Sequence, residues 1–190
     1  MTRKVIFVNS LFPCLSETFV FDQFQMLRQA GLDFVIVSNH RPADNQVHPR
    51  MREIQGEVEY LCEAGKMEIL AAHLQALLRE PVRYMKALPA IFKSRERLKT
   101  TLAHFTGAVL LLRRHDAFPR PHLHAHFTYG GAAVAMWASR LSGLSYTLTL
   151  HGSDLIYDDP PDLHRRLLAA FKRALHGRCF LAQIRSVSAR

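Results

Sequence analysis

Short apolar runs and one amphipathic segment alternate along the first forty residues of the chain. Residues 4–9 (KVIFVN) and 33–38 (DFVIVS) are continuous apolar runs, the pattern typical of strands buried on both faces of a sheet. Between them, apolar side chains recur at helical spacing up to Gly31, a glycine placed to end a helix. Ser16 is positioned to cap this helix and Glu17 to complement its dipole. The chain is therefore expected to begin with a strand, a helix and a second strand.

The later elements follow from the same patterns. Residues 57–61 form a weaker apolar run, and residues 66–114 are mostly helical in pattern. Pro81 and Pro89 are expected to cut that helical stretch into pieces. The remaining expected elements are a helix at 132–141, a strand at 145–150, a helix at 162–176 and a strand at 179–184. Alternation of this kind predicts an α/β fold, a Rossmann-like three-layer domain with a mostly parallel sheet.

The stretch that begins at His122 carries the strongest functional signal. In HLHAHF the histidines alternate with apolar residues, so His122, His124 and His126 are expected to share one strand face. Two successive strands joined by a crossover helix are almost always parallel, so their carboxyl ends lie at one edge of the sheet. His126 and His151 both fall at that edge, where ligands bind in open α/β sheets.

Composition narrows the class of protein. Of the 190 residues, 48% are hydrophobic, which is enough for one domain over residues 1–190 with a sizeable core. No apolar run approaches the ~18 residues of a membrane span, and the first apolar run is too short for a signal peptide, so a cytoplasmic location is expected. Cys14, Cys62 and Cys179 are too widely spaced for a disulfide framework or a CxxC zinc site, and we expect reduced thiols. The first turn has no GxGxxG, so a dinucleotide fingerprint is missing.

The charge balance favours anionic partners. The chain has 25 basic and 16 acidic residues, a net charge of +9. Basic and apolar side chains interleave in residues 79–99, which fits either a peripheral helix on an anionic membrane, such as the inner face of the cell membrane, or a solvated helix face. A basic nucleic-acid-binding module is a further alternative. The basic residues cluster in one helical stretch without a recognition fold, so no nucleic-acid partner is expected.

Three segments together resemble a known family. Residues 11–31 (LFPCLSETFVFDQFQMLRQAG), 124–127 (HAHF) and 147–155 (TLTLHGSDL) are similar, in order and spacing, to motifs of family 4 glycosyltransferases. The closest likeness is to the subgroup that builds exopolysaccharides of the colanic-acid type. The resemblance implies half of a GT-B architecture, in which two Rossmann-like domains face each other across a cleft. Residues 1–190 would be the amino-terminal, acceptor-side domain, truncated near its end, with the carboxy-terminal donor domain absent.

The resemblance also implies an activity. Such enzymes transfer a sugar from a nucleotide-sugar donor to a saccharide acceptor, here a lipid-linked one, with retention at the anomeric carbon. The leaving phosphate takes the acceptor proton, so no protein nucleophile is needed, and neither a metal nor another cofactor is expected. A chain that lacks the donor domain is expected to be catalytically incomplete by itself. The alternative is a non-catalytic, truncated remnant.

The resemblance assigns site residues one by one. His151 matches the family histidine beside the transferred sugar and is the expected catalytic residue, although a strand-end histidine bound to a backbone carbonyl is the alternative. The expected substrate-binding residues are Asn9, Ser16, Glu17, Thr18, His126, Tyr129, Gly152 and Asp154. Asp154 also suits a loop cap, Ser16 a helix cap and His126 a packing role.

A metal site is the remaining alternative for the three strand histidines. Imidazoles spaced by two on one strand can share an ion. However, parallel strands are usually covered on both faces, and no carboxylate or thiolate lies nearby in sequence. We therefore expect His122 and His124 to be structural and no metal to bind.

Overall fold

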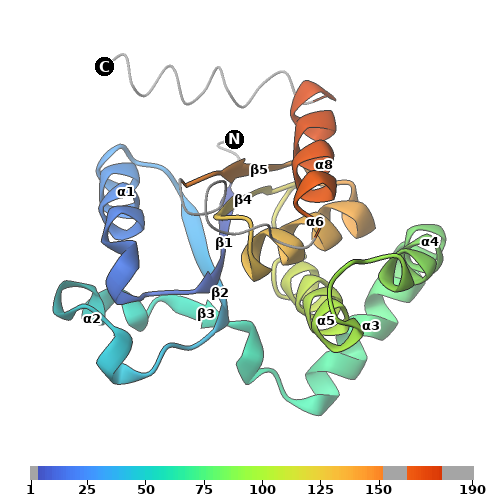
Figure 1. Cartoon of the computed structure of the whole chain (residues 1–190), viewed down its shortest axis with the longest axis horizontal. Coiled ribbons are helices and arrows are strands. Elements are labelled where there is room, and N and C mark those ends of the chain that lie inside the picture. The colour runs from blue at the N-terminus through green and yellow to red at the C-terminus, as the bar shows by residue number, and fades with distance from the viewer. Residues whose placement is uncertain (1–3, 152–161, 177–190) are drawn as a thin grey trace.

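The central sheet is parallel throughout the part of the chain that the computed structural model describes, residues 4–151 and 162–176. Its strands lie in the order β3-β2-β1-β4-β5 (Figure 1). They are β1 (Val5–Leu11), β2 (Phe34–His40), β3 (Val58–Tyr60), β4 (His122–His126) and β5 (Tyr146–Thr149). Helices cover both faces of the sheet, so the predicted Rossmann-like, three-layer α/β fold is confirmed.

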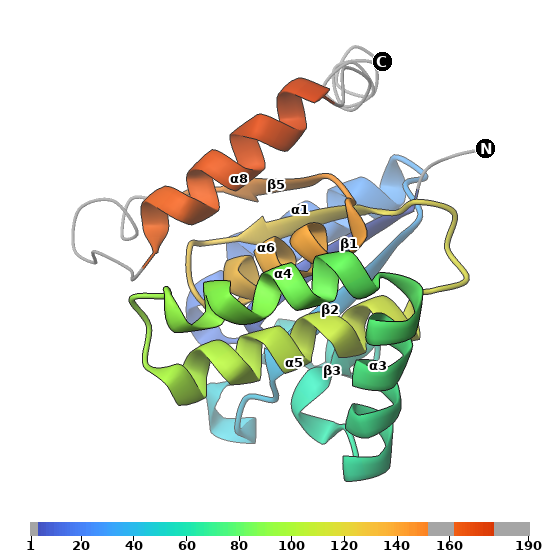
Figure 2. The same cartoon turned by 90° about the vertical axis from the view of Figure 1, so that its right-hand side faces the viewer.

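The helices divide between the two faces. They are α1 (Thr18–Gln29), α2 (Arg52–Gln55), α3 (Lys66–Arg79), α4 (Pro81–Phe92), α5 (Leu98–Arg114), α6 (Gly130–Ser142) and α8 (Leu163–His176). Four short 3₁₀ helices lie between them: Leu15–Glu17, Asp44–Gln46, Pro49–Met51 and Leu61–Glu63. Helices α1 and α2 lie on one side of the sheet and α3 to α6 on the other, while α8 packs against β5 and α6 (Figures 1 and 2).

The order of the strands reverses at β1. From β1 the chain moves outward to β2 and β3, then returns to pair β4 on the other side of β1 and continues outward to β5. Val5 is in register with both Phe34 of β2 and His122 of β4. The connections that leave β1 and β4 at their carboxyl ends therefore go to opposite faces. In open α/β sheets this is the place where ligands bind.

Two apolar clusters hold the layers together, because successive strand residues face opposite sides. Phe7 of β1 points toward α1 and lies edge-on to Phe24, with ring centroids 4.8 Å apart. Ile6 and Val8 face the other way and pack with the α5–α6 layer, which includes Phe105 and Trp137. The single apolar run of the first strand thus supplies both cores, as expected for a strand covered on both faces.

Helix α6 lies unusually close to the sheet, and glycine permits this approach. A Cβ atom added to Gly131 would lie 2.6 Å from the carbonyl oxygen of Val8 and 2.8 Å from the carbonyl carbon of Asn9. Most residues of α6 are buried, and they are mainly small. At its other end Gly143 has φ of 81°, a left-handed cap that favours glycine. The first turn of α6 is therefore pressed against the carboxyl end of β1.

Two predictions about helix ends are wrong. Pro89 does not cut the helical stretch, because α4 continues through it to Phe92; the proline removes one N–H donor without ending the helix. Ser16 does not cap α1, because it lies inside a 3₁₀ turn, and its hydroxyl contacts the sulfur of Cys14 at 3.4 Å. Pro81, by contrast, begins α4 as expected.

Other expectations can be compared with the described residues only. Within residues 4–151 and 162–176 no helix is both long enough and apolar enough to cross a membrane. Cys14 and Cys62 are free thiols, as predicted. The predicted strand at 179–184 and Cys179 lie outside the described residues.

Candidate functional site

The two histidines predicted to share the carboxyl edge of the sheet do lie together there. His126 is the last residue of β4, and His151 follows β5 by two positions. Their ring centroids are 5.8 Å apart. The expected proximity is therefore confirmed, and it follows from the parallel pairing of β4 with β5, in which His126 is in register with Thr149.

Aromatic side chains surround His151. Its ring centroid lies 4.3 Å from that of Phe127 and 4.7 Å from that of Phe19, which α1 supplies. Phe19 is 43% exposed, so the aromatic side chains around His151 reach the surface of the molecule. Phe127 has φ of 62°, a left-handed conformation that a bulky residue rarely adopts. Backbone strain of this kind clusters at functional sites, and here it turns the chain directly after His126.

His126 is buried without a hydrogen-bond partner among the described residues. Only 1% of it is exposed, and neither ring nitrogen is hydrogen-bonded. Its ring stacks on Phe7 with centroids 5.9 Å apart. Burial lowers the pKa of His126 to about 3, with smaller contributions from His124 and His151. At neutral pH the ring is therefore uncharged, with one nitrogen able to donate a hydrogen bond and the other able to accept one.

The two preceding histidines of β4 are fully engaged with β5. His122 contacts the hydroxyl oxygens of Ser145 and Thr147, both at 2.9 Å. His124 contacts the hydroxyls of Thr147 and Thr149 at 2.7 and 3.0 Å. These contacts fasten the strands together side by side and give both rings the structural role that was expected. Among the described residues, no group of three histidine, cysteine, aspartate or glutamate side chains is arranged to hold a metal ion.

The turn between β1 and α1 contributes a carboxyl group with an altered pKa. Burial raises the pKa of Glu17 to about 7, while a hydrogen bond with the Cys14 thiol lowers it by a smaller amount. One carboxylate oxygen of Glu17 is buried with no hydrogen-bond partner among the described residues. Burial also raises the pKa of Cys14. A carboxyl group that titrates near neutral pH can both accept and donate a proton; Thr18 follows it as the first residue of α1.

Three buried polar side chains gather where β1, β2 and β4 end. Asn9 and Asn39 are 2% and 8% exposed, and Thr128 is wholly buried. Asn9 donates to the carbonyl of Val37 at 3.3 Å. The side-chain oxygens of all three residues have no hydrogen-bond partner among the described residues. Sequence reasoning selected Asn9 but missed Asn39 and Thr128, although both come directly at or after the end of a predicted strand.

The other side of this edge is built around Arg166, which sequence reasoning also missed. Arg166 is 2% exposed, forms an ion pair with Glu96, and donates to the backbone carbonyls of Thr128 and Tyr129. Glu96 contacts Nδ1 of His104 at 3.0 Å. This chain of contacts holds α8 and the start of α5 against the first turn of α6. The sequence contains no signal for it, since Arg166 and Glu96 are 70 positions apart.

Gly130 and Gly131 open α6 between these groups. A Cβ atom on Gly130 would lie 2.9 Å from both Asn39 Nδ2 and His104 Nε2. The amide of Gly131 donates to the hydroxyl of Ser10 at 2.9 Å. The positive end of the α6 dipole therefore faces a polar cluster at the point where the strand order reverses.

The remaining predicted site residues are placed only in part. Tyr129 occupies the N-cap position of α6 without a capping side-chain hydrogen bond, and its ring stacks on Phe127 with centroids 6.1 Å apart. Gly152 and Asp154 lie outside the described residues.

Comparison of the chain with protein-family models, with curated proteins and with solved structures finds no match. The candidate site therefore stands on its own geometry.

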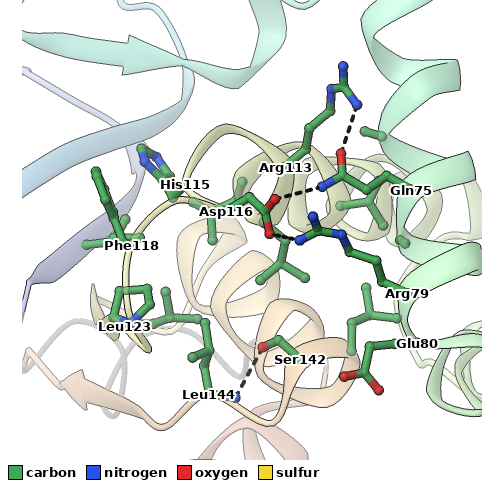
Figure 3. A pocket seen from close by; sticks show the side chains of 18 of the residues that line it. Gln75, Arg79, Glu80, Arg113, His115, Asp116, Phe118, Leu123, Ser142 and Leu144 are labelled. Carbon is green, nitrogen blue, oxygen red and sulfur yellow. Dashed lines mark hydrogen bonds and ion pairs between the residues drawn. The ribbon is translucent and has the colours of Figure 1, made fainter.

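A cavity of about 240 Å³ lies at the opposite, amino-terminal end of β4 (Figure 3). Apolar side chains such as Leu123 and Leu144 line it, while its rim is polar. At the rim Asp116 pairs with Arg79 and accepts from Gln75, which in turn accepts from Arg113 at 2.8 Å. Asp116, Arg79, Gln75 and Arg113 thus form one chain of polar contacts at this rim.

Proposed function

We propose that this chain is the acceptor-side domain of a retaining glycosyltransferase, which transfers a sugar from a nucleotide-sugar donor to a saccharide acceptor. One observation carries the proposal. The rings of His126 and His151 lie 5.8 Å apart at the carboxyl edge of the sheet, next to the reversal of strand order. In open α/β sheets this is the usual place for a ligand.

The chemistry of the site suits a carbohydrate. A sugar ring presents hydroxyl groups around its rim and C–H groups on its faces. Phe19 and Phe127 offer aromatic surfaces to the C–H groups, while the neutral His126 offers one donor and one acceptor for a hydroxyl. Pockets that combine aromatic walls with a few placed polar groups are typical of small-molecule sites.

In this proposal His151 is the catalytic residue. It would contact a hydroxyl of the transferred sugar and stabilise positive charge that develops at the anomeric carbon. Asn9, Ser16, Glu17, Thr18 and Tyr129 would contact the substrates around it, and Glu17 could exchange a proton because its pKa is about 7. The resemblance assigns proton transfer from the acceptor to the leaving phosphate, and the donor nucleotide to a second domain.

A binding experiment tests the site in this chain. Saccharides and nucleotide sugars are titrated into labelled protein while the imidazole signals are followed by NMR. We expect the His126 and His151 signals to shift, while the His122 signal, whose ring nitrogens contact Ser145 and Thr147, stays in place. Titration into the tens of millimolar that moves neither the His126 nor the His151 signal would contradict the proposal.

A transfer experiment tests the role of His151. In protein that also includes a donor domain, His151→Ala should lower sugar transfer by about a hundredfold or more, because a group that stabilises charge in the transition state is lost. His48→Ala is the control, since this ring caps a short turn by accepting from the amide of Arg50. Full transfer by His151→Ala would refute the assigned role.

A further inference from the structure

The outer layer of the molecule exposes an unusual amount of apolar surface. Of the fifteen large apolar side chains that are exposed in the described residues, ten fall between residues 67 and 102. Such a concentration on one part of a surface usually marks an interaction site. We call the exposed side chains of α3 and α4 the apolar outer surface: Met67, Leu70, Leu74, Leu77, Leu78, Val82, Met85 and Phe92.

Helix α3 turns one apolar stripe inward and a second one outward. Ala72 is buried in the core, and His73 contacts Tyr84 and Thr106 at 2.9 and 3.2 Å. On the outer side Met67, Leu70, Leu74 and Leu78 follow at steps of three and four residues, the spacing of a single helix face. Met67 and Leu78 are 76% and 72% exposed.

Helix α4 also exposes apolar side chains. Val82, Met85 and Phe92 are 64%, 56% and 75% exposed. Helices α3, α4 and α5 form the outermost layer on this side of the molecule, with the sheet behind them (Figure 2). The sequence pattern had pointed only to residues 79–99, which the structure divides among the end of α3, α4 and the start of α5.

Positive charge accompanies the apolar outer surface. Residues 66–102 contain eight basic and three acidic side chains. All three acidic groups are engaged: Glu68 with Arg114, Glu80 with Arg83, and Glu96 with Arg166. Within the described residues no ion-pair partner is found for the basic residues Lys66, Lys86, Lys93, Arg95, Arg97 and Lys99. The uncompensated charge around the apolar side chains is therefore positive.

We propose that the apolar outer surface docks on an anionic lipid bilayer. Apolar side chains that enter the boundary between headgroups and acyl chains, with lysine and arginine beside them, are the pattern of interfacial helices. Nucleic acid would use the positive charge but leave the apolar side chains in water. A second copy of the chain would cover the apolar side chains but bring two positive surfaces together. This inference does not rest on the proposed sugar transfer.

Flotation with lipid vesicles tests the proposal. We expect the chain to bind vesicles that contain about 30% phosphatidylglycerol, to bind pure phosphatidylcholine vesicles about tenfold more weakly, and to lose binding as salt rises. The triple variant Met67→Gln/Leu74→Gln/Leu78→Gln should bind the anionic vesicles about tenfold or more weakly than the parent chain. Because these side chains are exposed, circular dichroism should show an unchanged fold.

Matched control variants distinguish binding through the apolar outer surface from nonspecific adsorption to vesicles. The triple variant Leu15→Gln/Met26→Gln/Leu168→Gln removes three other exposed apolar side chains, from elements outside this surface, and should bind like the parent chain. The double variant Lys86→Gln/Lys93→Gln should weaken binding about tenfold, whereas Arg50→Gln/Arg52→Gln should not.

Three results would overturn the proposal. Equal binding to neutral and anionic vesicles would show that the positive charge has no role in binding. An equal loss of vesicle binding in the two triple variants would show that the apolar outer surface has no special role. A dimer that the Met67 triple variant dissociates, without any vesicle binding, would assign the surface to a second copy of the chain. None of these results depends on whether saccharides shift the His126 signal, so the two proposals fail separately.

Discussion

Two buried side chains on opposite sides of the sheet, near the carboxyl end of β4, differ in how they are paired. On the α6 side, the guanidinium of Arg166 pairs with Glu96 and donates to two backbone carbonyls, although its Nε atom has no hydrogen-bond partner among the described residues. On the α1 side, His126 is equally buried, yet neither ring nitrogen has a hydrogen-bond partner among the described residues. Buried polar groups are normally paired, so the second arrangement is the one that calls for an explanation.

This difference separates a structural cluster from a candidate binding site. The ion pair on the α6 side spans a long sequence distance and fixes α8 and α5 to the start of α6. The α1 side retains hydrogen-bonding capacity at His126 and Glu17 beside aromatic walls. We infer that the first side is retained for the fold and the second for a ligand.

The largest expected effect comes from breaking the α6 side. Glu96→Gln leaves the buried guanidinium of Arg166 without its carboxylate, which should lower the free energy of unfolding by about 3 kcal/mol. Chemical denaturation measures it. Glu80→Gln is the control, because the exposed pair of Glu80 with Arg83 should contribute less than about 1 kcal/mol. Similar losses in both variants would mean that the buried ion pair does not hold the two elements together.

A smaller effect should distinguish two histidines of the same strand and face. His122→Leu removes the partner of the Ser145 and Thr147 hydroxyls and should cost about 2 kcal/mol of stability. His126→Leu removes no such hydrogen bond and should leave stability within about 1 kcal/mol of the parent chain. Denaturation curves of both variants, recorded at the same pH, provide the comparison.

The saccharide titration followed by NMR also distinguishes His126 from His122. His126→Leu should abolish the saccharide-induced shift of the His151 signal, whereas His122→Leu should preserve it. If His126→Leu destabilised the chain as much as His122→Leu, the ring would be a packing element like its neighbours, and the α1 side would lose its distinction.

The sequence was informative where a pattern is local. Apolar runs and helical spacing predicted the parallel sheet and its layers, and the crossover rule brought His126 and His151 to one edge. Pairings of side chains distant in sequence, such as Arg166 with Glu96, carry no periodic signal and could not be predicted. The pattern of α3 shows an apolar face, but periodicity cannot tell whether anything covers it. In the structure Leu74 and Leu78 of this face are exposed, which the pattern alone could not indicate.

The smallest expected effect concerns Glu17. It tests whether ionisation of this partly buried carboxyl on the α1 side lowers the stability of the fold. Its pKa is about 7 in the folded chain and near 4.5 when unfolded. Between these values the folded state binds more protons, so this group lowers stability as pH rises from about 4.5 to 7. Because Glu17 is only partly buried, we expect Glu17→Gln to be more stable than the parent by roughly 1–2 kcal/mol at pH 8 and equal to it at pH 4.5. Glu53→Gln, an exposed change on α2, should show no such divergence in denaturation curves between the two pH values. A Glu17→Gln difference that stayed constant with pH would show that burial of this carboxyl imposes no cost, and Glu17 would then not support the α1 side as a ligand site.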